Sequence, residues 1–449
     1  MIRIGILHSL TGTMAISEAP LVQIIKMAID EINETGGVLG EQVETVIADG
    51  ASDPLEFSRK ARELRQSGIP TIFGCWTSAS RKAVKDVIEG SSTQLWYPIQ
   101  YEGIEQSPNI YYTGSTLNQQ IEPAVQWCIE HLGKSFFLVG SDYVFPRTAN
   151  RLIRSIVLQA GGKIVEDIYH PLGDKKFSST IDLIKQHKPD VVFNTLNGDS
   201  NLFFYKQLHQ KGMDAEEFPV MAVSIGETEA ESITEEINGH YTCWSYFQTV
   251  NTAENRAFIE KVQNNINRCA VTSDPMATAY AQLHLWGKAA NAAGSIRRED
   301  IHRALKKLWI DSPLGQFQII ENNHTPKLAL IGKANANGQF EIVWSSKDQI
   351  EPLPWLGMEK LQLPASRLIK EVMGELPRFI DLSSQLEHEV DKRKKAELAI
   401  QKERDIAQSY LNTASVMMVA INKDKEVILA NKKTCEVLGY PEENILGKN

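Results

Sequence analysis

The sequence predicts an α/β fold of two lobes, then a long helix, then the first part of an α+β domain. Three observations predict this order. Short apolar runs alternate with amphipathic segments from Ile2 to about Val343, which is the pattern of β-α units in parallel sheets. Roughly ten such units are too many for one sheet, so they are expected to divide between two lobes. From about Trp355 strand signals stop, and short strands return only near the end of the chain.

The apolar runs and the amphipathic segments give the elements in order. Expected strands are Ile2–Leu7, Val43–Ala48, Thr71–Gly74, Gln94–Pro98, Phe136–Gly140, Lys163–Tyr169, Val191–Leu196 and Val220–Ser224. Expected helices are Pro20–Thr35, Glu56–Ser67, Ser78–Gly90, Ile121–Leu132, Ala149–Ala160, Ser178–His187 and Phe203–Lys211. The glycine pair 36–37 ends the first helix.

Composition restricts the class of protein. The net charge of -9 over 449 residues does not favour nucleic-acid binding. Five scattered cysteines without a CxxC pair favour free thiols in a reducing compartment. The N-terminus MIRIGILHSL lacks a leader, and no run of about 18 apolar residues predicts a membrane span. These features predict a cytoplasmic protein.

Polar residues follow six of the predicted strands. The loops read HSLTGTMA, CWTSAS, PIQYEG, SDYVFP, NGDSN and IGETE. Ligands of open parallel sheets bind beyond the carboxyl ends of the strands, so these loops predict a polar cleft between the lobes. Thr77 and Ser78 begin a helix whose free N–H groups are expected to face the ligand.

No residue pattern indicates catalysis, a metal or a cofactor. LGKS at 132–135 lacks the upstream glycine of a P-loop, and the ten histidines form no ligand pairs. A nucleophile–base motif is absent, so Cys75 is interpreted as a buried structural residue. Glu227 and Asp142 could form an acid–base pair, but acceptance of N–H donors from a neutral ligand is favoured. Tyr97 and Tyr143 could line the cleft or pack between the lobes.

The loops together resemble the urea- and short-chain-amide-binding proteins of the type I periplasmic-binding-protein family. The stretches that carry the resemblance, within Ile2 to Pro354, are GILHSLTGTMAISE, GCWTSASRKAV, YPIQYEGIEQSPNIYYTG, GSDYVFPRTAN, PDVVFNTLNGDSN and TSDPMATAY. The resemblance implies a Venus-flytrap fold over 1–354, with lobe 1 at about 1–119 and 250–325 and lobe 2 at about 120–249 and 326–354.

The resemblance also implies a ligand site. The pocket of the family falls on Ser78, Tyr97 and Tyr143, and matching segments contain Trp76, Thr77, Glu227, Ser9 and Thr11. Cys75 stands where transporter members have glycine and amide-sensing members have cysteine, which leaves urea versus amide open.

The tail departs from the transporter members of the family. Residues 355–411 are expected to form a helical linker, with apolar residues at Phe379, Leu382, Leu386 and Val390 that suit a two-stranded coiled coil. A solvated single helix is the alternative, because Arg393 weakens the seam. Residues 412–449 resemble the start of a PAS domain, with a hairpin around residues 422–426 and a helix at Lys432–Leu438.

The leading hypothesis is a sensor. The clamshell would close on urea or a small aliphatic amide and pass the change through a homodimeric coiled coil to PAS and an output domain, such as a histidine kinase of a two-component system or a cyclic-dinucleotide enzyme. The alternatives are the binding component of a urea or amide ABC transporter and an amide-hydrolysing enzyme. The first conflicts with the tail, and the second with the lack of a nucleophile.

Overall fold

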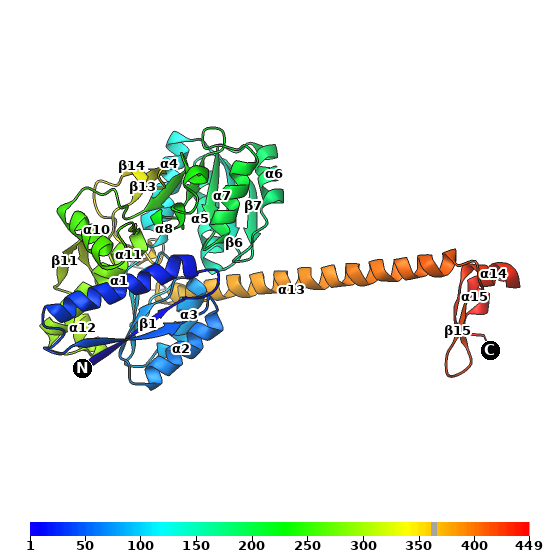
Figure 1. Ribbon diagram of the computed structural model, residues 1–449, viewed down its shortest axis with the longest axis horizontal. Coiled ribbons are helices and arrows are strands. Elements are labelled where there is room, and N and C mark those ends of the chain that lie inside the picture. Colours follow the sequence, from blue (N-terminus) through cyan, green and yellow to red (C-terminus); the bar gives the residue numbers. More distant parts are fainter. Residues whose placement is uncertain (361–365, 449) are drawn as a thin grey trace. The chain divides into compact units, whose positions relative to one another are not determined.

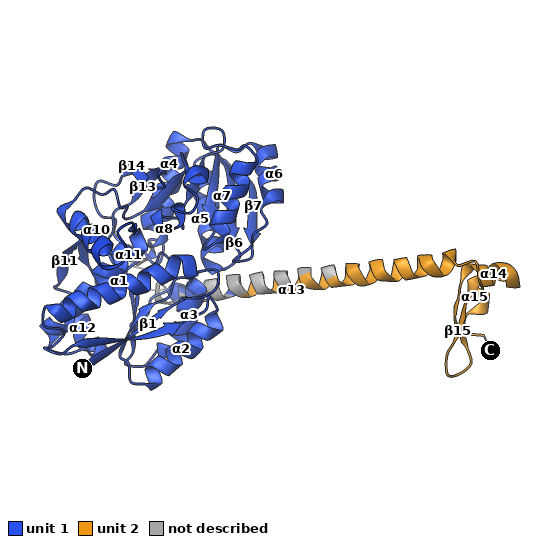
Figure 2. Cartoon of the chain, in the orientation of Figure 1, with its two compact units in different colours: residues 1–381 blue, residues 382–449 orange. Residues whose placement is uncertain are grey.

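Two compact units make up the chain. The computed structural model describes residues 1–360 and 366–448. The units are Met1–Asp381 and Leu382–Asn449 (Figure 2). Residues 361–365 of the predicted linker and Asn449 of the predicted PAS domain lie outside the described residues.

The first unit contains two sheets, each the centre of one lobe (Figure 1). The first sheet is parallel, in the order β2 (Val43–Asp49), β1 (Ile2–His8), β3 (Thr71–Gly74), β4 (Gln94–Tyr97) and β5 (Ile110–Tyr112). Its lobe also contains α1 (Ala15–Glu34), α2 (Pro54–Gln66), α3 (Ser78–Ile88), α10 (Ala253–Asn265), α11 (Asp274–Ala293), α12 (Arg298–Leu305), β11 (Trp309–Ser312) and β12 (Gly315–Gln318). In Figure 1, α1 lies on one side of β1, and α2 and α3 lie on the other.

The second sheet is mixed. Its order is β14 (Phe340–Ser345), β13 (Leu330–Ala334), β10 (Tyr241–Trp244), β9 (Val220–Ala222), β8 (Val191–Thr195), β6 (Ser135–Ser141) and β7 (Lys163–His170), with β13 and β14 antiparallel. Its helices are α4 (Leu117–His131), α5 (Val144–Gln159), α6 (Ser178–His187), α7 (Ser200–Gln210), α8 (Glu227–Ala230) and α9 (Thr234–Ile237). Alternate residues of β6 enter two cores: Phe136 packs with α4 and α5, and Phe137 packs with α6 and α7.

The chain passes between the lobes after β5, after β10 and after β12. The two-lobed α/β fold predicted from the alternating pattern is therefore confirmed. In both sheets the polar loops lie at the carboxyl ends of the parallel strands, which places them where ligands of such sheets bind.

Five of the seven predicted helices begin earlier than predicted. Besides the two described next, α2 begins at Pro54, α5 at Val144 and α7 at Ser200, where the sequence predicted Glu56, Ala149 and Phe203. The helix expected from Pro20 begins at Ala15, and the helix expected from Ile121 begins at Leu117. Pro20 is the sixth residue of α1 and Pro123 the seventh of α4, so each removes one helical N–H from the second turn.

The long helix and the PAS-like hairpin are both present. Helix α13 runs Ser366–Thr413 after the short η1 (Met358–Lys360). The hairpin β15 (Val419–Ile421) and β16 (Val427–Ala430) is followed by α14 (Lys432–Leu438), as predicted, and by α15 (Glu442–Ile445). Among the described residues, none of the helices combines the length and apolarity needed to cross a bilayer.

Candidate ligand-binding site

The start of α3 is built by a sharp turn after β3. A Cβ on Gly74 would lie 2.1 Å from the Leu7 carbonyl oxygen, so only glycine fits against β1 there. Cys75 follows with φ of 69°, a left-handed conformation that side chains seldom adopt. Thr77 is the N-cap, because its Oγ1 accepts a hydrogen bond from the Ser80 N–H at 3.1 Å. The prediction that Thr77 begins this helix is thus matched by its geometry.

The Ser78 hydroxyl group is already engaged inside the protein. It donates to the Glu102 carboxylate and accepts from Arg81 Nη1 at 3.1 Å. Arg81 was not among the candidate site residues that the sequence predicted. Arg81 lies one helical turn after Ser78, with its side chain fully buried.

Two carboxylates compensate the charge of Arg81. Nη2 lies 2.9 Å from Glu102 Oε1, and Nε lies 3.0 Å from Glu105 Oε1. Lys82 Nζ lies 3.0 Å from Glu105 Oε2. Burial alone would raise the pKa of both carboxyls, yet the charges of Arg81 and Lys82 hold the two pKa values below their usual range. The cluster of Arg81, Glu102 and Glu105 is therefore ionised, and we call it the Arg81 cluster.

Aromatic residues from both lobes lie next to the Arg81 cluster. The guanidinium carbon lies 5.1 Å from the Tyr97 ring centroid, and the Tyr97 hydroxyl donates to the Trp76 carbonyl at 2.5 Å. Tyr143, the N-cap of α5, comes from the second lobe, where α3 and α5 are in contact. Burial, with Tyr97 and Glu102 nearby, raises the pKa of Tyr143. The structure thus brings Trp76, Tyr97 and Tyr143 together with Ser78.

Some polar atoms here have no partner in the described chain. The buried Trp76 Nε1 and Gln100 Oε1 make no hydrogen bond to a described residue. Gln100 Nε2 donates to the Val223 carbonyl at 3.0 Å and to Ser224 Oγ at 3.1 Å, which links the lobes. An unpaired buried donor or acceptor is costly, so these atoms point to a missing polar partner. Gln100 stood in the quoted PIQYEG loop but was not selected, because a lone glutamine carries little signal.

Glu227 belongs to a second polar group. Its Oε1 accepts from the Gln248 N–H at 2.6 Å, and its buried Oε2 has no partner among the described residues. Burial, helped by Asp274 and Glu229, raises the pKa of Glu227 to about 8. At neutral pH this carboxyl is mostly protonated, so it offers a donor as well as the acceptor that the sequence suggested.

Ser9 and Thr11 are used within the loop after β1. Ser9 Oγ accepts from the Ser52 N–H at 3.0 Å, and Thr11 Oγ1 donates to Asp49 Oδ2 at 2.8 Å on the surface. Their hydroxyl groups hold the loop in shape and do not join Ser78 and Tyr97. The same loop reaches the second lobe through Thr13, whose hydroxyl donates to Asp199.

The lobes are closed on each other. Besides the contact of Thr13 with Asp199, Ser17 Oγ donates to Glu229 Oε1 at 2.5 Å. Thr228 Oγ1 also donates to Ser273 Oγ at 3.3 Å. The candidate site therefore lies between lobes in contact, where water is displaced and hydrogen bonds are stronger than in solvent.

The environment of the thiols opposes covalent catalysis. Burial raises the pKa of the Cys75 thiol well above its usual value, so the nucleophilic thiolate is scarce. No cluster of metal-ligating side chains occurs in the described ranges 1–360 and 366–448.

We expect a thiol reagent to distinguish the five cysteines. Cys75, Cys128 and Cys243 are buried, Cys269 is exposed and Cys435 is half-buried. In the native chain, Cys269 and Cys435 should react with a disulfide reagent, whereas the three buried thiols should react only after denaturation. Mass mapping of labelled peptides measures this, and fast labelling of Cys75 would contradict its buried position.

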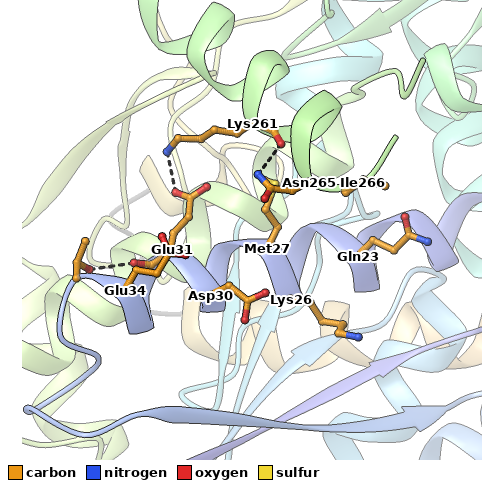
Figure 3. Close-up of a pocket in the computed structure, with 10 residues that line it drawn as sticks. Gln23, Lys26, Met27, Asp30, Glu31, Glu34, Lys261, Asn265 and Ile266 are labelled. Carbon is orange, nitrogen blue, oxygen red and sulfur yellow. Dashed lines mark hydrogen bonds and ion pairs between the residues drawn. The ribbon is translucent and has the colours of Figure 1, made fainter. Parts of the chain in front are cut away.

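A separate groove lies between α1 and α10 (Figure 3). It has a volume of about 620 Å³, and Figure 3 shows the charged residues along its walls, including Lys26, Asp30, Glu31 and Lys261. Burial would raise the pKa of Glu31, but the His284 ring, with Nε2 3.5 Å away, and hydrogen bonds from Lys261 and Tyr280 lower it to about 2. None of the predicted site residues lines this groove.

The two-lobed fold, with polar loops at the strand ends between the lobes, is that of a ligand-binding domain. Residues 2–361 match the family of periplasmic binding protein domains, and this chain belongs to that family. Residues 407–449 match the PAS fold. The resemblance to a type I periplasmic binding protein with a C-terminal PAS domain is therefore confirmed at this level.

Several known proteins are similar to this chain. "Leu/Ile/Val-binding protein homolog 6" of Brucella melitensis biotype 1 is 25% identical over 332 residues, which are 71% of this chain and 83% of that protein. "Limonene hydroxylase" of Geobacillus stearothermophilus is 36% identical over 116 residues, 26% of this chain and 21% of that protein. This chain thus spans about a fifth of the length of the second protein.

Solved structures share the fold. An ABC-transporter solute-binding protein of R. palustris, in complex with 4-hydroxybenzoate, has a TM-score of 0.71 at 23% identity, over 80% of this chain and 100% of that chain. The branched-chain amino acid binding protein LivJ of Streptococcus pneumoniae, in complex with isoleucine, has a TM-score of 0.68 at 22% identity, over 78% and 100%. At these identities the likeness extends to the fold alone.

The cytoplasmic location predicted from the N-terminus and the free cysteines is wrong. The family that covers residues 2–361 is one of periplasmic proteins. An N-terminus without leader features and a set of unpaired thiols were weak signals, because neither depends on the fold that defines the family.

Proposed function

We propose that the chain is a sensor region that binds urea or a small aliphatic amide between its lobes and relays closure through α13 to the PAS fold. Ser78, Tyr97, Tyr143, Trp76 and Thr77 form the ligand site in this proposal, and Glu227 contributes from the second polar group. Ser9 and Thr11 act indirectly, by shaping the loop after β1. The proposed domains are 1–354, 355–411 and 412–449.

One observation supports a neutral ligand above all. The positive charge of Arg81 is compensated by Glu102 and Glu105 within the protein. A ligand carboxylate at Ser78 would therefore meet an Arg81 side chain that is already paired and would lie close to the Glu102 carboxylate, at a high desolvation cost. The unpaired groups of this site are instead neutral: the Trp76 N–H and the Gln100 carbonyl. An amide group has the complementary N–H donors and C=O acceptor.

Calorimetry with urea, acetamide, formamide, leucine and 4-hydroxybenzoate tests the ligand class. We expect heat of binding with at least one of the three neutral ligands and none with the two carboxylates. Acetamide and urea differ by one methyl and one amino group, so the preferred one reveals whether the end of the pocket is apolar or polar. Tight binding of leucine without binding of urea, acetamide or formamide would contradict the proposed function.

The Ser78→Ala variant tests the site itself. Loss of the hydroxyl removes one hydrogen bond from Glu102 beside the ligand, which should cost about 0.5–1.5 kcal/mol of binding, and more if a ligand donor stays unpaired. We expect a several-fold to roughly hundred-fold weaker Kd with the fold intact. Ser80→Ala is the matched control, because the buried Ser80 hydroxyl lies in the same helical turn and bonds to Thr77, whereas the Glu102 carboxylate accepts from Ser78. Equal Kd values for the two variants would show that Ser78 only supports the helix.

A second candidate is the substrate-binding component of a urea or amide transporter. It is favoured by the solved structures of ABC-transporter solute-binding proteins with the same fold. The two candidates differ in the tail. Ligand added to the full chain should change amide hydrogen exchange in residues 407–448 for a sensor, whereas a transport component requires no change beyond the lobes.

A further inference from the structure

The loop between β4 and β5, residues 98–109, touches the start of α3 on one side. Glu102 accepts from Ser78 and Arg81, and Glu105 accepts from Arg81 and Lys82. Both carboxylates are buried, so their positions are fixed by the donors on α3. A shift of the first turn of α3 therefore moves this loop.

The other side of the loop is fitted to the segment that leaves the lobes, residues 352–358, which we call the exit segment. The Ile104 N–H donates to the Pro354 carbonyl at 2.5 Å. Gly103 has φ of 69°, and a Cβ there would lie 2.6 Å from the Pro354 oxygen. Ile104 also has a positive φ, 54°, which is rare for a β-branched residue and persists only where the surroundings impose it.

Trp355 lies between the β4–β5 loop and α13. Its side chain is buried, with Nε1 3.5 Å from Gln106 Oε1 in the same loop. A Cβ on Gly374 of α13 would lie 3.8 Å from the ring of Trp355, so the ring packs against this part of the helix. Residues of α3, the β4–β5 loop, the exit segment and α13 thus form one chain of contacts within the first unit.

We propose that the β4–β5 loop couples occupation of the ligand site to the exit segment, with Trp355 as the positioning residue for the first turns of α13. The identity of the ligand in this inference rests on the proposed function. The contacts among α3, the β4–β5 loop, the exit segment and α13 do not depend on it. A ligand at Ser78 competes for the hydrogen bonds of Glu102, and the next two residues hold Pro354. The coupling can be no larger than the ligand's preference for one arrangement of the loop, and it acts equally in both directions.

The first experiment needs no ligand. In the full chain, the added Cβ of Gly103→Ala forces the Pro354 carbonyl away. Gly90→Ala is the control. Gly90 also has a positive φ, 72°, but a Cβ there would meet no atom within 4 Å. We expect Gly103→Ala to speed amide exchange on the order of tenfold in residues 352–358, in residues 366–374 and in α3. Gly90→Ala should leave the exit segment and α13 unchanged. Equal exchange rates for the two variants in residues 352–358 and 366–374 would overturn the coupling.

The second experiment adds urea or acetamide at saturation. The wild-type chain should show slower exchange in residues 366–374 with the ligand. Trp355→Ala should keep ligand affinity within a few-fold by calorimetry and lose this effect. Trp309→Ala, which removes a half-exposed ring from β11, should keep both.

The outcomes separate the two proposals. If no neutral ligand binds the wild-type chain, the proposed function fails, and the ligand-free comparison of Gly103→Ala with Gly90→Ala still decides the coupling. If ligand binds and Trp355→Ala retains the full ligand effect on residues 366–374, the function stands and the coupling through Trp355 is wrong. Should Gly103→Ala fail to fold, the comparison of Trp355→Ala with Trp309→Ala decides it.

Discussion

Arg81→Met is expected to lower the free energy of unfolding by about 3–5 kcal/mol at pH 7, because it leaves two buried carboxylates with only the partly exposed Lys82 and Lys85 as cations. Folded proteins are stable by about 5–15 kcal/mol, so this is a large share of the total. Methionine nearly preserves the length of the side chain, which limits the contribution of an empty cavity. Guanidinium chloride is the appropriate denaturant, since urea is a candidate ligand.

Arg62→Met is the matched control. Arg62 lies on the exposed side of α2, where a surface substitution should change stability by no more than about 0.5 kcal/mol. Similar denaturation midpoints for Arg81→Met and the wild type would contradict the ion-pair assignment.

The stabilities of the wild type and of Arg81→Met are expected to change in opposite directions as the pH falls. In the wild type the pKa values of Glu102 and Glu105 are held below their usual range, so their contribution to stability is present above about pH 4.5 and is lost as the pH falls through the folded-state values. Without Arg81, burial dominates and raises both pKa values, so the variant gains stability as the pH falls toward about 4.5.

The measurable quantity is the stability difference between the two proteins. It should shrink steadily from pH 8 to pH 5, and the raised pKa of Glu227, common to both, cancels from the difference. Lys82, Lys85 and Tyr112 also face Glu105 and are unchanged by the substitution. A difference that is constant over this range would show that Arg81 stabilises the fold by packing and not by charge.

The start of α3 could be predicted from the sequence, whereas the Arg81 cluster could not. Thr77 and Ser78 precede an amphipathic run, which is a local signal that specifies a cap. Arg81 meets Glu102 and Glu105 across more than 20 residues, and only the adjacency of β3 and β4 brings them together. An arginine on an amphipathic helix is usually exposed to solvent. The burial of Arg81 therefore depends on tertiary structure alone.

The loop after β1 shows the same limit. Its position at a strand end was predictable, but Ser9 and Thr11 find partners in Ser52 and Asp49 because β2 is the neighbour of β1. Position in a sheet thus identifies candidate loops, whereas the choice of which hydroxyl group remains available to a ligand depends on hydrogen bonds between distant segments.

Truncation before Phe379 is expected to convert a dimer into a monomer that still binds ligand. Helix α13 has 48 residues, and Phe379, Leu382 and Leu386 on it are about 60% exposed in the single chain. Val390 and Ile400 continue the stripe, also exposed. A helix of this length has no internal means to cover an apolar stripe, so a second copy of the chain is the natural partner.

The full chain should therefore dimerise at tens of micromolar in light scattering, weakly because Arg393 and Arg404 interrupt the seam. A double variant, Leu386→Gln with Val390→Gln, should shift the full chain toward monomer, whereas Lys402→Gln on the opposite face should not. Ligand affinity should stay within a few-fold in all these proteins, since every candidate ligand residue lies upstream and only the coupling to α13 is changed. A full chain that stays monomeric would mean that α13 is a solvated helix. In that case Trp355 could still position α13 within one chain, but closure could not be relayed by two helices moving against each other.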